Sequence, residues 1–376
     1  AAAFVPGAVA GSRPREYSND YQPIFDSRQT GIFLKGEFDF GWARLTSLTS
    51  AEWQRNLSGY DVDGSSAPIQ HVYFPGRQQT QAQELILSSA TESRLQWLLG
   101  GFFFRDDGDI TLSHITSGTL VETIDGGVKT KTFAFYGDVT YEVVPRLFAT
   151  AGVRYSRDKL VEHFTSIFDP SLTTASKSFE ALTPRASLRY QLADRTSLYA
   201  SYNAGYKSGG FNPSTLSIVP VRPEKIDAFE LGFKHASRAF DFNLAGYYYK
   251  YDDLQVTAYQ GPITSLVNAA KAKIYGIEAD VAIRPVAGLT ITAAGAWNHA
   301  RYKSFPGAPL YAFDLVTGIS VTPGDASGRP IVNAPEFSGN VNATYVQPLP
   351  SGSLEFTGNF SYQSVVYYDA FQATKQ

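Results

Sequence analysis

Cysteine is absent from this sequence and histidine is rare, with Cys 0 and His 5. Without cysteine the chain has neither a disulfide framework nor a thiolate metal site. Hydrophobic residues make up 43% and mean hydropathy is -0.17, yet no run approaches the roughly 18 consecutive apolar residues of a membrane-spanning helix. The formal net charge of -3 gives no broad basic field, which argues against nucleic acid as a main partner.

Methionine is also absent, and the chain opens on Ala1-Ala2-Ala3-Phe4 without the charged and apolar segments of a signal peptide. At the other end it stops at Gln376, shortly after a predicted strand. We therefore expect an internal piece of a longer protein. A signal peptide and any N-terminal domain would lie upstream.

Aromatic residues and glycine are abundant, with Tyr 23, Phe 26, Trp 4 and Gly 32. Such a composition favours strands over helices. Many segments alternate between apolar and polar residues with a period of two, and several approach the roughly ten residues that a tilted outer-membrane strand requires. They cover residues 133–143, 147–155, 187–192, 197–204, 229–234, 274–283, 289–297, 339–345 and 354–362. The sequence therefore predicts an all-β fold.

The segment 274–283 shows the alternation well. One face carries Tyr275, Ile277, Ala279, Val281 and Ile283, and the other carries Gly276, Glu278, Asp280 and Ala282. Because hydrocarbon does not tolerate charge at mid-depth, we expect the first face to contact lipid and the second to face the lumen.

The connections are predicted to alternate between short turns and long polar loops. Short turns are expected at residues 35–37, 90–93, 144–145, 193–194, 236–237, 285–288 and 348–352. Long loops are expected at residues 57–79, 106–129, 159–178, 208–223, 258–266 and 304–335. This asymmetry is typical of outer-membrane barrels, which have short periplasmic turns and longer external loops, and a soluble sandwich has no reason for it.

The segments amount to about fourteen strands of a transmembrane antiparallel β-barrel forming one domain over residues 1–376. Open sheet edges are not tolerated in lipid, so further strands should close a larger barrel. The family resemblance carried by the three stretches given next implies about 22 strands for the whole barrel.

Three stretches carry a family resemblance: Tyr202-Asn203-Ala204-Gly205-Tyr206-Lys207-Ser208-Gly209-Gly210-Phe211-Asn212, the strand from Pro223-Glu224 through Glu230-Leu231-Gly232-Phe233-Lys234, and residues 268–280 with Tyr275-Gly276-Ile277-Glu278. In order and spacing they resemble the barrel portion of TonB-dependent receptors. Further support comes from Thr183-Pro184-Arg185 and from residues 151–158, which resemble the family's Gly-x-Arg-Tyr strand. No plug domain, energy-coupling box or terminal strand ending in an aromatic residue is present in this sequence.

The resemblance implies an outer-membrane receptor that imports a scarce nutrient actively, energised by the TonB coupling protein through a plug. Iron chelates such as ferric siderophores come first as cargo, with cobalamin and oligosaccharides as alternatives. A passive porin is the first rival function, and a secreted or adhesin-type binding protein is the second. The partners would be outer-membrane lipid, the coupling protein and a small ligand, with no nucleic acid and no cofactor.

Candidate site residues fall into two groups. The loop after residue 206 would shape the external mouth and meet ligand, where Gly209 and Gly210 would permit an unusual backbone conformation; its residues are Lys207, Gly209, Gly210, Phe211 and Asn212. The same glycines could serve only as a turn. The polar face of two strands would line the lumen or contact a plug through Glu230, Lys234, Glu278 and Asp280, or form an ordinary wet wall.

Other motifs give no catalytic site. Histidines lack the spacing of a metal-binding helix, and nucleophile, phosphate-binding and dinucleotide motifs are missing in their required contexts, so we expect no enzyme. Residues 61–64 and 106–109 hold Asp-rich sequences that are read as turns or as surface calcium ligands. Residues 247–251, Tyr-Tyr-Tyr-Lys-Tyr, form an interfacial girdle or a stacking surface for ligand.

Overall fold

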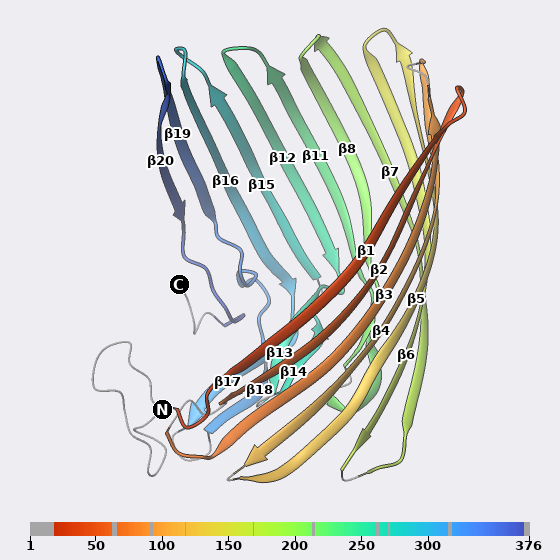
Figure 1. Cartoon of the computed structure of the whole chain (residues 1–376), viewed down its shortest axis with the longest axis vertical. Helices are drawn as coiled ribbons and strands as arrows, with labels where there is room; N and C mark the ends of the chain where they lie inside the picture. Colours follow the sequence, from red (N-terminus) through yellow and green to blue (C-terminus); the bar gives the residue numbers. More distant parts are fainter. Residues whose placement is uncertain are drawn as a thin grey trace.

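The computed structural model describes residues 19–61, 66–90, 93–116, 118–167, 169–212, 215–260, 263–269, 271–314 and 318–371. Fourteen antiparallel strands form one curved sheet, each paired with its neighbours in chain order (Figure 1). They are β1 (Ile24–Asp39), β2 (Ala43–Asp61), β3 (Gln70–Ser89), β4 (Leu95–Thr116), β5 (Thr119–Val144), β6 (Leu147–Ser166), β7 (Thr173–Ala193), β8 (Thr196–Lys207), β11 (Glu224–Ala236), β12 (Phe240–Asp252), β15 (Lys271–Ile283), β16 (Leu289–Ser304), β19 (Phe337–Leu349) and β20 (Gly352–Gln363). The predicted all-β class and strand number are confirmed.

Three connections contain small hairpins of their own. They are formed by β9 (Gly210–Asn212) with β10 (Ser217–Val221), β13 (Gln255–Gln260) with β14 (Ile263–Asn268), and β17 (Pro306–Asp314) with β18 (Gly318–Asp325). All follow strands that run away from the short turns, so they gather at the lower end of the sheet in Figure 1. The described part of the chain contains no helix long and apolar enough to cross a membrane.

The short turns that the structure describes lie together at the opposite end, as predicted, with one correction, and residues 91 and 92 of the expected turn 90–93 lie outside the described residues. Residues 35–37 are not a turn: Gly36 lies within β1 and pairs with Ser47. The chain reverses a few residues later, where Gly41 has φ 83° and its N–H donates to the Asp39 carboxylate at 2.7 Å. A glycine in the left-handed region, held by an Asp side chain, specifies the turn better than a glycine in extended backbone.

The long connections were predicted wrongly in the first half of the chain. Residues 106–129 are the outer parts of β4 and β5, which meet at Gly118 (φ 75°), and much of 57–79 and 159–178 is also strand. Beyond the bilayer both faces of a strand are wet, so the apolar alternation that marks a strand disappears. Cross-strand polar contacts remain, such as Thr111 Oγ1 donating to Asp125 at 2.5 Å and Thr132 Oγ1 donating to Asp158 at 2.6 Å.

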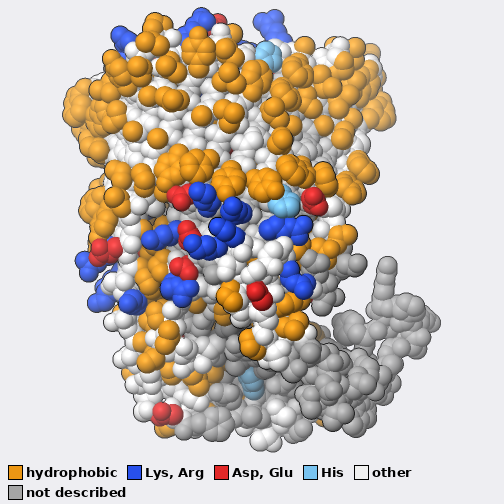
Figure 2. Space-filling view, turned by 180° about the vertical axis from the view of Figure 1, so that it is seen from behind, with side chains coloured by type: hydrophobic (Ala, Val, Ile, Leu, Met, Phe, Trp, Pro, Cys, Tyr) orange, Lys and Arg blue, Asp and Glu red, His pale blue; other side chains and the backbone are white. Residues whose placement is uncertain are grey.

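Register assigns the side chains of the sheet to two faces. On β15, Tyr275, Ile277 and Ile283 are exposed and align with outer-face residues of the neighbouring strands, including Tyr248 on β12 and Trp297 on β16. Figure 2 shows an apolar band that covers the half of the sheet nearest the short turns, and register assigns these side chains to the same outer face. The predicted lipid-facing side of residues 274–283 is thus one continuous apolar surface.

The opposite, inner face carries the buried apolar clusters, and both lie toward the loop end. The larger one packs Ala272 of β15 and Tyr302 of β16 against Phe305, Ala308 and Ala326 of the β17–β18 connection. The smaller one joins Leu112, Ile124 and Phe164. The hairpins therefore fold over the inner face instead of extending away from the sheet.

Candidate functional site: the inner wall and the loop-side mouth

The four predicted inner-wall residues do lie on one face. Glu230 lies opposite Tyr247, and Lys234 lies opposite Asn243. On the other side of β12, Asp280 lies opposite the same Asn243, and Glu278 lies opposite Ala245, two residues along on the same face. This is the face opposite the apolar band. Whether these side chains contact a plug stays a prediction.

These residues form two separate groups. Glu230 accepts a hydrogen bond of 2.5 Å from the Tyr199 hydroxyl, and the Lys234 ammonium lies 5.3 Å from the centroid of the same ring. The carboxylates of Glu278 and Asp280 instead border an open hollow of about 530 Å³ that also exposes Ser338 and Asn340. Asp280 accepts a hydrogen bond of 2.8 Å from Asn243. The first group is internally paired, while the second has acceptor capacity left for a partner.

The tyrosine run 247–251 is divided between the two faces. Tyr248 stacks with Tyr275 on the outer face, with ring centroids 6.4 Å apart, where it suits an interfacial girdle. Tyr247 and Tyr249 stack on the inner face at 4.9 Å, and the Tyr247 hydroxyl donates to Asn298 at 3.3 Å. Tyr248 therefore lies on the face where an interfacial girdle is expected, and Tyr247 and Tyr249 lie on the face where a surface that stacks on ligand is expected.

The loop predicted to shape the mouth is packed into the structure. Phe211 is only 7% exposed, and the Asn212 side chain both donates to the Leu266 carbonyl at 3.2 Å and accepts from its N–H at 2.9 Å. Lys207 is exposed at the end of β8, and Gly210 belongs to β9. The contacts of Phe211 and Asn212 therefore support a structural role, and contact of this loop with ligand stays a prediction.

The two glycines act through space and not through an unusual conformation. Positive φ is recorded at neither, so that part of the prediction is wrong. A Cβ added to Gly209 would instead collide with the Phe179 ring and the Val221 carbonyl oxygen, whereas at Gly210 it would meet only ordinary contact. Gly209 therefore allows the chain leaving β8 to lie directly against β7 and β10.

The β13–β14 hairpin is fastened to this loop by a polar network that the sequence did not predict. Asn268 accepts from the Arg222 N–H at 2.8 Å and donates to the carbonyls of Arg222 at 3.0 Å and Asp253 at 2.9 Å. Gln255 donates to the Ser208 carbonyl at 2.9 Å, and its N–H donates to Glu224 at 2.7 Å. The Arg222 guanidinium donates to Asp253 at 2.6 Å, which raises the pKa of Arg222. Hairpins β9–β10 and β13–β14 are thus joined by hydrogen bonds into one body at the loop end of the sheet, which we call the rim.

Glu162 is the second feature that the sequence did not reveal. It lies on the inner face of the outer part of β6, is fully buried, and neither carboxylate oxygen has a hydrogen-bond partner in the described part of the chain. Burial raises the pKa of Glu162 to about 7. In the sequence, the one sign of this burial is that Glu162 lies on the same face of the strand as Leu160 and Phe164, at a spacing of two residues, and both of these are buried.

Among the residues that the structure describes, no group of three or more His, Asp or Glu side chains is placed to hold a metal ion. The interpretation of residues 106–109 as a turn or calcium loop is wrong, because they lie within β4. There Asp106 accepts from Gln78 at 3.0 Å, and Asp107 faces Arg105 and Lys129 at 3.5 and 3.6 Å. In the other Asp-rich sequence, residues 62–64 lie outside the described residues.

Comparison with known proteins accounts for this architecture. A family model described as "TonB dependent receptor-like, beta-barrel" matches residues 3–376. The chain belongs to the TonB-dependent receptor family. This is a family of outer-membrane β-barrel receptors, not of enzymes, as the sequence predicted.

Individual relatives agree with the assignment. A pesticin receptor of Yersinia enterocolitica is 27% identical over 240 residues, which are 62% of this chain and 35% of the receptor. The solved ferric yersiniabactin uptake receptor FyuA of Yersinia pestis superposes with a TM-score of 0.80 at 18% identity, covering 94% of this chain and 52% of that one. The siderophore receptor PiuA of Acinetobacter baumannii gives 0.74 at 15% identity, covering 96% and 57%. The chain therefore spans about a third of the curated relative and about half of each solved receptor.

Proposed function

We propose that this chain forms part of the wall of an active outer-membrane importer whose cargo is a ferric siderophore. The observation that carries the proposal is the rim: hairpins β9–β10 and β13–β14 are hydrogen-bonded into one body at the loop end, above an inner wall with exposed carboxylates and stacked tyrosines. A receptor that captures a scarce ligand needs such a preorganised mouth, because ordering a flexible loop on binding costs affinity.

The cargo class is supported by the names of the relatives. FyuA is described as a ferric yersiniabactin uptake receptor and PiuA as a siderophore receptor. At this level of identity the likeness supports the fold, and the cargo of the present chain is an inference. Aromatic stacking at Tyr247 and Tyr249 suits a chelate with flat rings as well as a sugar, so cobalamin and oligosaccharides are the alternative cargoes to compare.

The proposed energy source is the TonB coupling protein, acting on a plug seated against the inner wall. Glu278 and Asp280 are the proposed contact points, because the hollow they border leaves their carboxylates accessible. A plug surface with Arg or Lys side chains would pair with them. Glu230 and Lys234 are proposed to contribute less, since both already engage Tyr199.

Growth and binding together test the cargo. A strain lacking the intact gene should fail to grow when one ferric siderophore is the sole iron source, and should grow normally on ferrous iron, cobalamin-supplemented or oligosaccharide media. The purified intact receptor should bind the same siderophore, measured by quenching of intrinsic fluorescence. Normal growth of the deleted strain on every ferric siderophore, with a growth defect on an oligosaccharide or cobalamin, would reject the iron proposal.

A further inference from the structure

The fourteen-stranded sheet is joined only in part between β7 and β8. The ladder between these strands ends where Arg185 lies opposite Asn203, although both strands continue beyond that point. Over the remaining stretch β7 stays paired with β6, and β8 stays paired with β11. The first residue of β7 beyond the ladder is Pro184, which has no N–H to donate. The two halves of the sheet therefore meet at a seam, where a hollow of about 320 Å³ is lined by Thr183 and Gly205 among others.

Hairpin β9–β10 of the rim reaches across this seam. The hairpin follows the end of β8, yet β9 lies against β6 and β10 lies against β7. The Tyr206 hydroxyl donates to the Asp158 carboxylate of β6 at 3.0 Å. Farther out, Leu216 packs against the apolar cluster that includes Phe164 of β6. Side-chain contacts thus dock the hairpin onto the inner face of the other half of the sheet.

Glu162 lies beneath the docked hairpin. On the inner face of β6 it is four residues beyond Asp158 and two residues before Phe164, so contacts with β8 and the hairpin occur on both sides of it. The neighbouring strands place only Val128 and Ala175 opposite Glu162. The side chain is fully buried, and among the described residues neither of its carboxylate oxygens has a hydrogen-bond partner. The hairpin therefore keeps water away from an acid that has no other partner.

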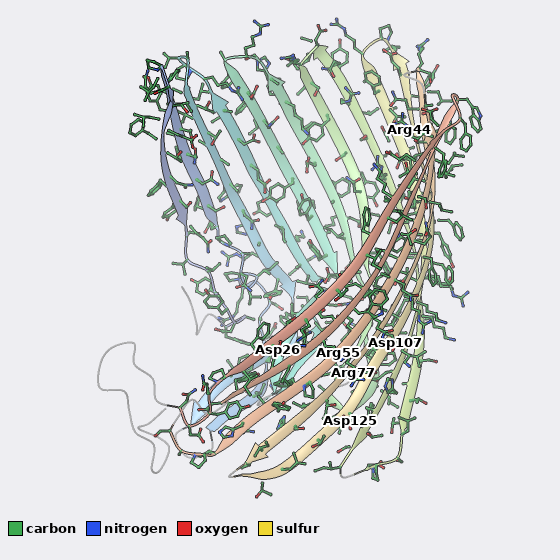
Figure 3. All side chains as sticks on the ribbon, viewed as in Figure 1. Asp26, Arg44, Arg55, Arg77, Asp107 and Asp125 are labelled. Carbon is green, nitrogen blue, oxygen red and sulfur yellow. The ribbon has the colours of Figure 1, made fainter. Side chains whose placement is uncertain are left out.

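Few charges face Glu162 from the elements packed around it. On β7, Lys177 shares the inner face but is exposed, and the described residues of β9–β10 carry no charged side chain. Asp158 of β6 and Asp106 of β4 are already hydrogen-bonded to other side chains. On β5 the nearest charged residues, among them Asp125 in Figure 3, lie on the outer face. Burial is thus the cause that raises the pKa of Glu162 to about 7.

We propose that Glu162 is a proton-controlled latch for hairpin β9–β10: the hairpin docks on β6 while the carboxyl group is protonated, and lifts when the carboxylate forms. A neutral carboxyl can stay under the hairpin at modest cost, whereas a carboxylate without a partner favours the state in which water reaches it. The seam supplies the hinge, because lifting breaks no ladder hydrogen bond between β7 and β8. Since β9–β10 is bonded to β13–β14, the rim moves as one body and widens the mouth. The latch depends on the fold alone and not on the cargo or the energy source.

Docking should be strongest in acid. With the hairpin lifted, Glu162 is in water and has its ordinary pKa of 4.5, and with the hairpin docked its pKa is about 7. The stability that the protonated carboxyl gives to the docked state is therefore fully present below pH 4.5 and is lost as pH rises to about 7. The docking equilibrium constant should fall about tenfold per pH unit across this window, about 300-fold in all, and stay level above it.

The distance between two spin labels on the intact receptor in lipid nanodiscs tests the latch. This chain has no cysteine, so labels are attached at Val219→Cys on β10 and Ser176→Cys on β7, both exposed, once any cysteine elsewhere in the receptor is replaced. A single short distance is expected at pH 4.5, with a longer distance gaining population up to pH 7. Leu216→Ala removes an apolar contact of the docked hairpin and brings the two states closer in population, and there the ratio of docked to lifted molecules should fall about 300-fold.

Control variants separate the latch from a general effect of pH. Glu162→Gln stays neutral, so its ratio of docked to lifted molecules should not change with pH, and Glu162→Leu should behave in the same way. Asp125→Asn, at an exposed acid on the outer face of the neighbouring strand, should respond as the unmodified receptor does. Folding of each variant is checked by the heat-dependent mobility of the barrel on a gel. A label distance in Leu216→Ala that is constant from pH 4.5 to pH 9, or a response that persists in a folded Glu162 variant, would overturn the proposal.

Discussion

Replacing Ala279 with arginine should destabilise the receptor far more than the same change one strand away. Ala279 lies on the outer face of β15, opposite Leu244 and Gly295, four positions along the strand from Tyr275 on one side and from Ile283 on the other. At about 3.4 Å per residue this places it about 14 Å along the strand from each rim of the band. A charge at that depth is close to the bilayer midplane.

Arginine on the lipid face at the midplane of a barrel costs about 2–4 kcal/mol. The matched control is Ala245→Arg on β12, because Ala245 is opposite Glu278 on the inner face at a similar depth. That substitution should cost less than about 1 kcal/mol, since its charge stays in a polar environment beside a carboxylate. Asp280→Asn should behave like the control. Urea titration of the intact receptor folding into lipid vesicles measures all three, and equal costs for Ala279→Arg and Ala245→Arg would refute the assignment of faces.

Three further predictions concern the loop end. The pKa of Glu162 is ordinarily 4.5 and is raised to about 7 in the folded chain. The outer part of β6 should therefore lose about 3 kcal/mol of stability as pH rises through this window. In hydrogen exchange, Glu162→Gln should flatten that slope, and Glu180→Gln should leave it unchanged. Asn268→Ala removes three hydrogen bonds and should loosen the β13–β14 hairpin by about 1–3 kcal/mol, seen as faster exchange or proteolysis there, whereas Asn340→Ala should have no effect at the rim. If the loop is scaffold, the double variant Phe211→Ala with Asn212→Ala should lower surface abundance and leave the ligand affinity of the remaining receptor unchanged. An affinity loss at normal abundance would instead assign these residues to ligand binding.

Sequence reasoning identified the membrane-spanning part of the fold because the bilayer imposes a strong pattern on it. On β15 and β11 the alternation of Ile277, Phe229 and Leu231 with charged neighbours can be read directly, and register confirmed the faces. Outside the bilayer that constraint is lost. The outer parts of β4 and β5, with Asp106, Asp107 and Asp109, were interpreted as a loop because acids and glycine are turn formers, although cross-strand partners hold them in strand.

For the inner-wall residues, the face of the sheet was predictable from the sequence, whereas the contacts of the candidate residues were not. The inner-face placement of Glu230 and Glu278 follows from alternation alone, whereas the engagement of Glu230 by Tyr199 depends on which residues register brings together. The clamp made by Asn268 and Gln255 joins residues far from their partners in the chain, so no local signal announces it. Phe211 looks like an available aromatic face in sequence, and only the packing of the hairpins shows that it is buried.

Uptake of a radiolabelled ferric siderophore by whole cells tests the central claim most directly. Four strains are compared: with and without the intact gene, each with and without the TonB coupling protein. The account predicts saturable uptake only where both proteins are present, and accumulation against a concentration gradient. Uptake that depends on the gene but persists unchanged without the coupling protein would show a passive pore and contradict the account.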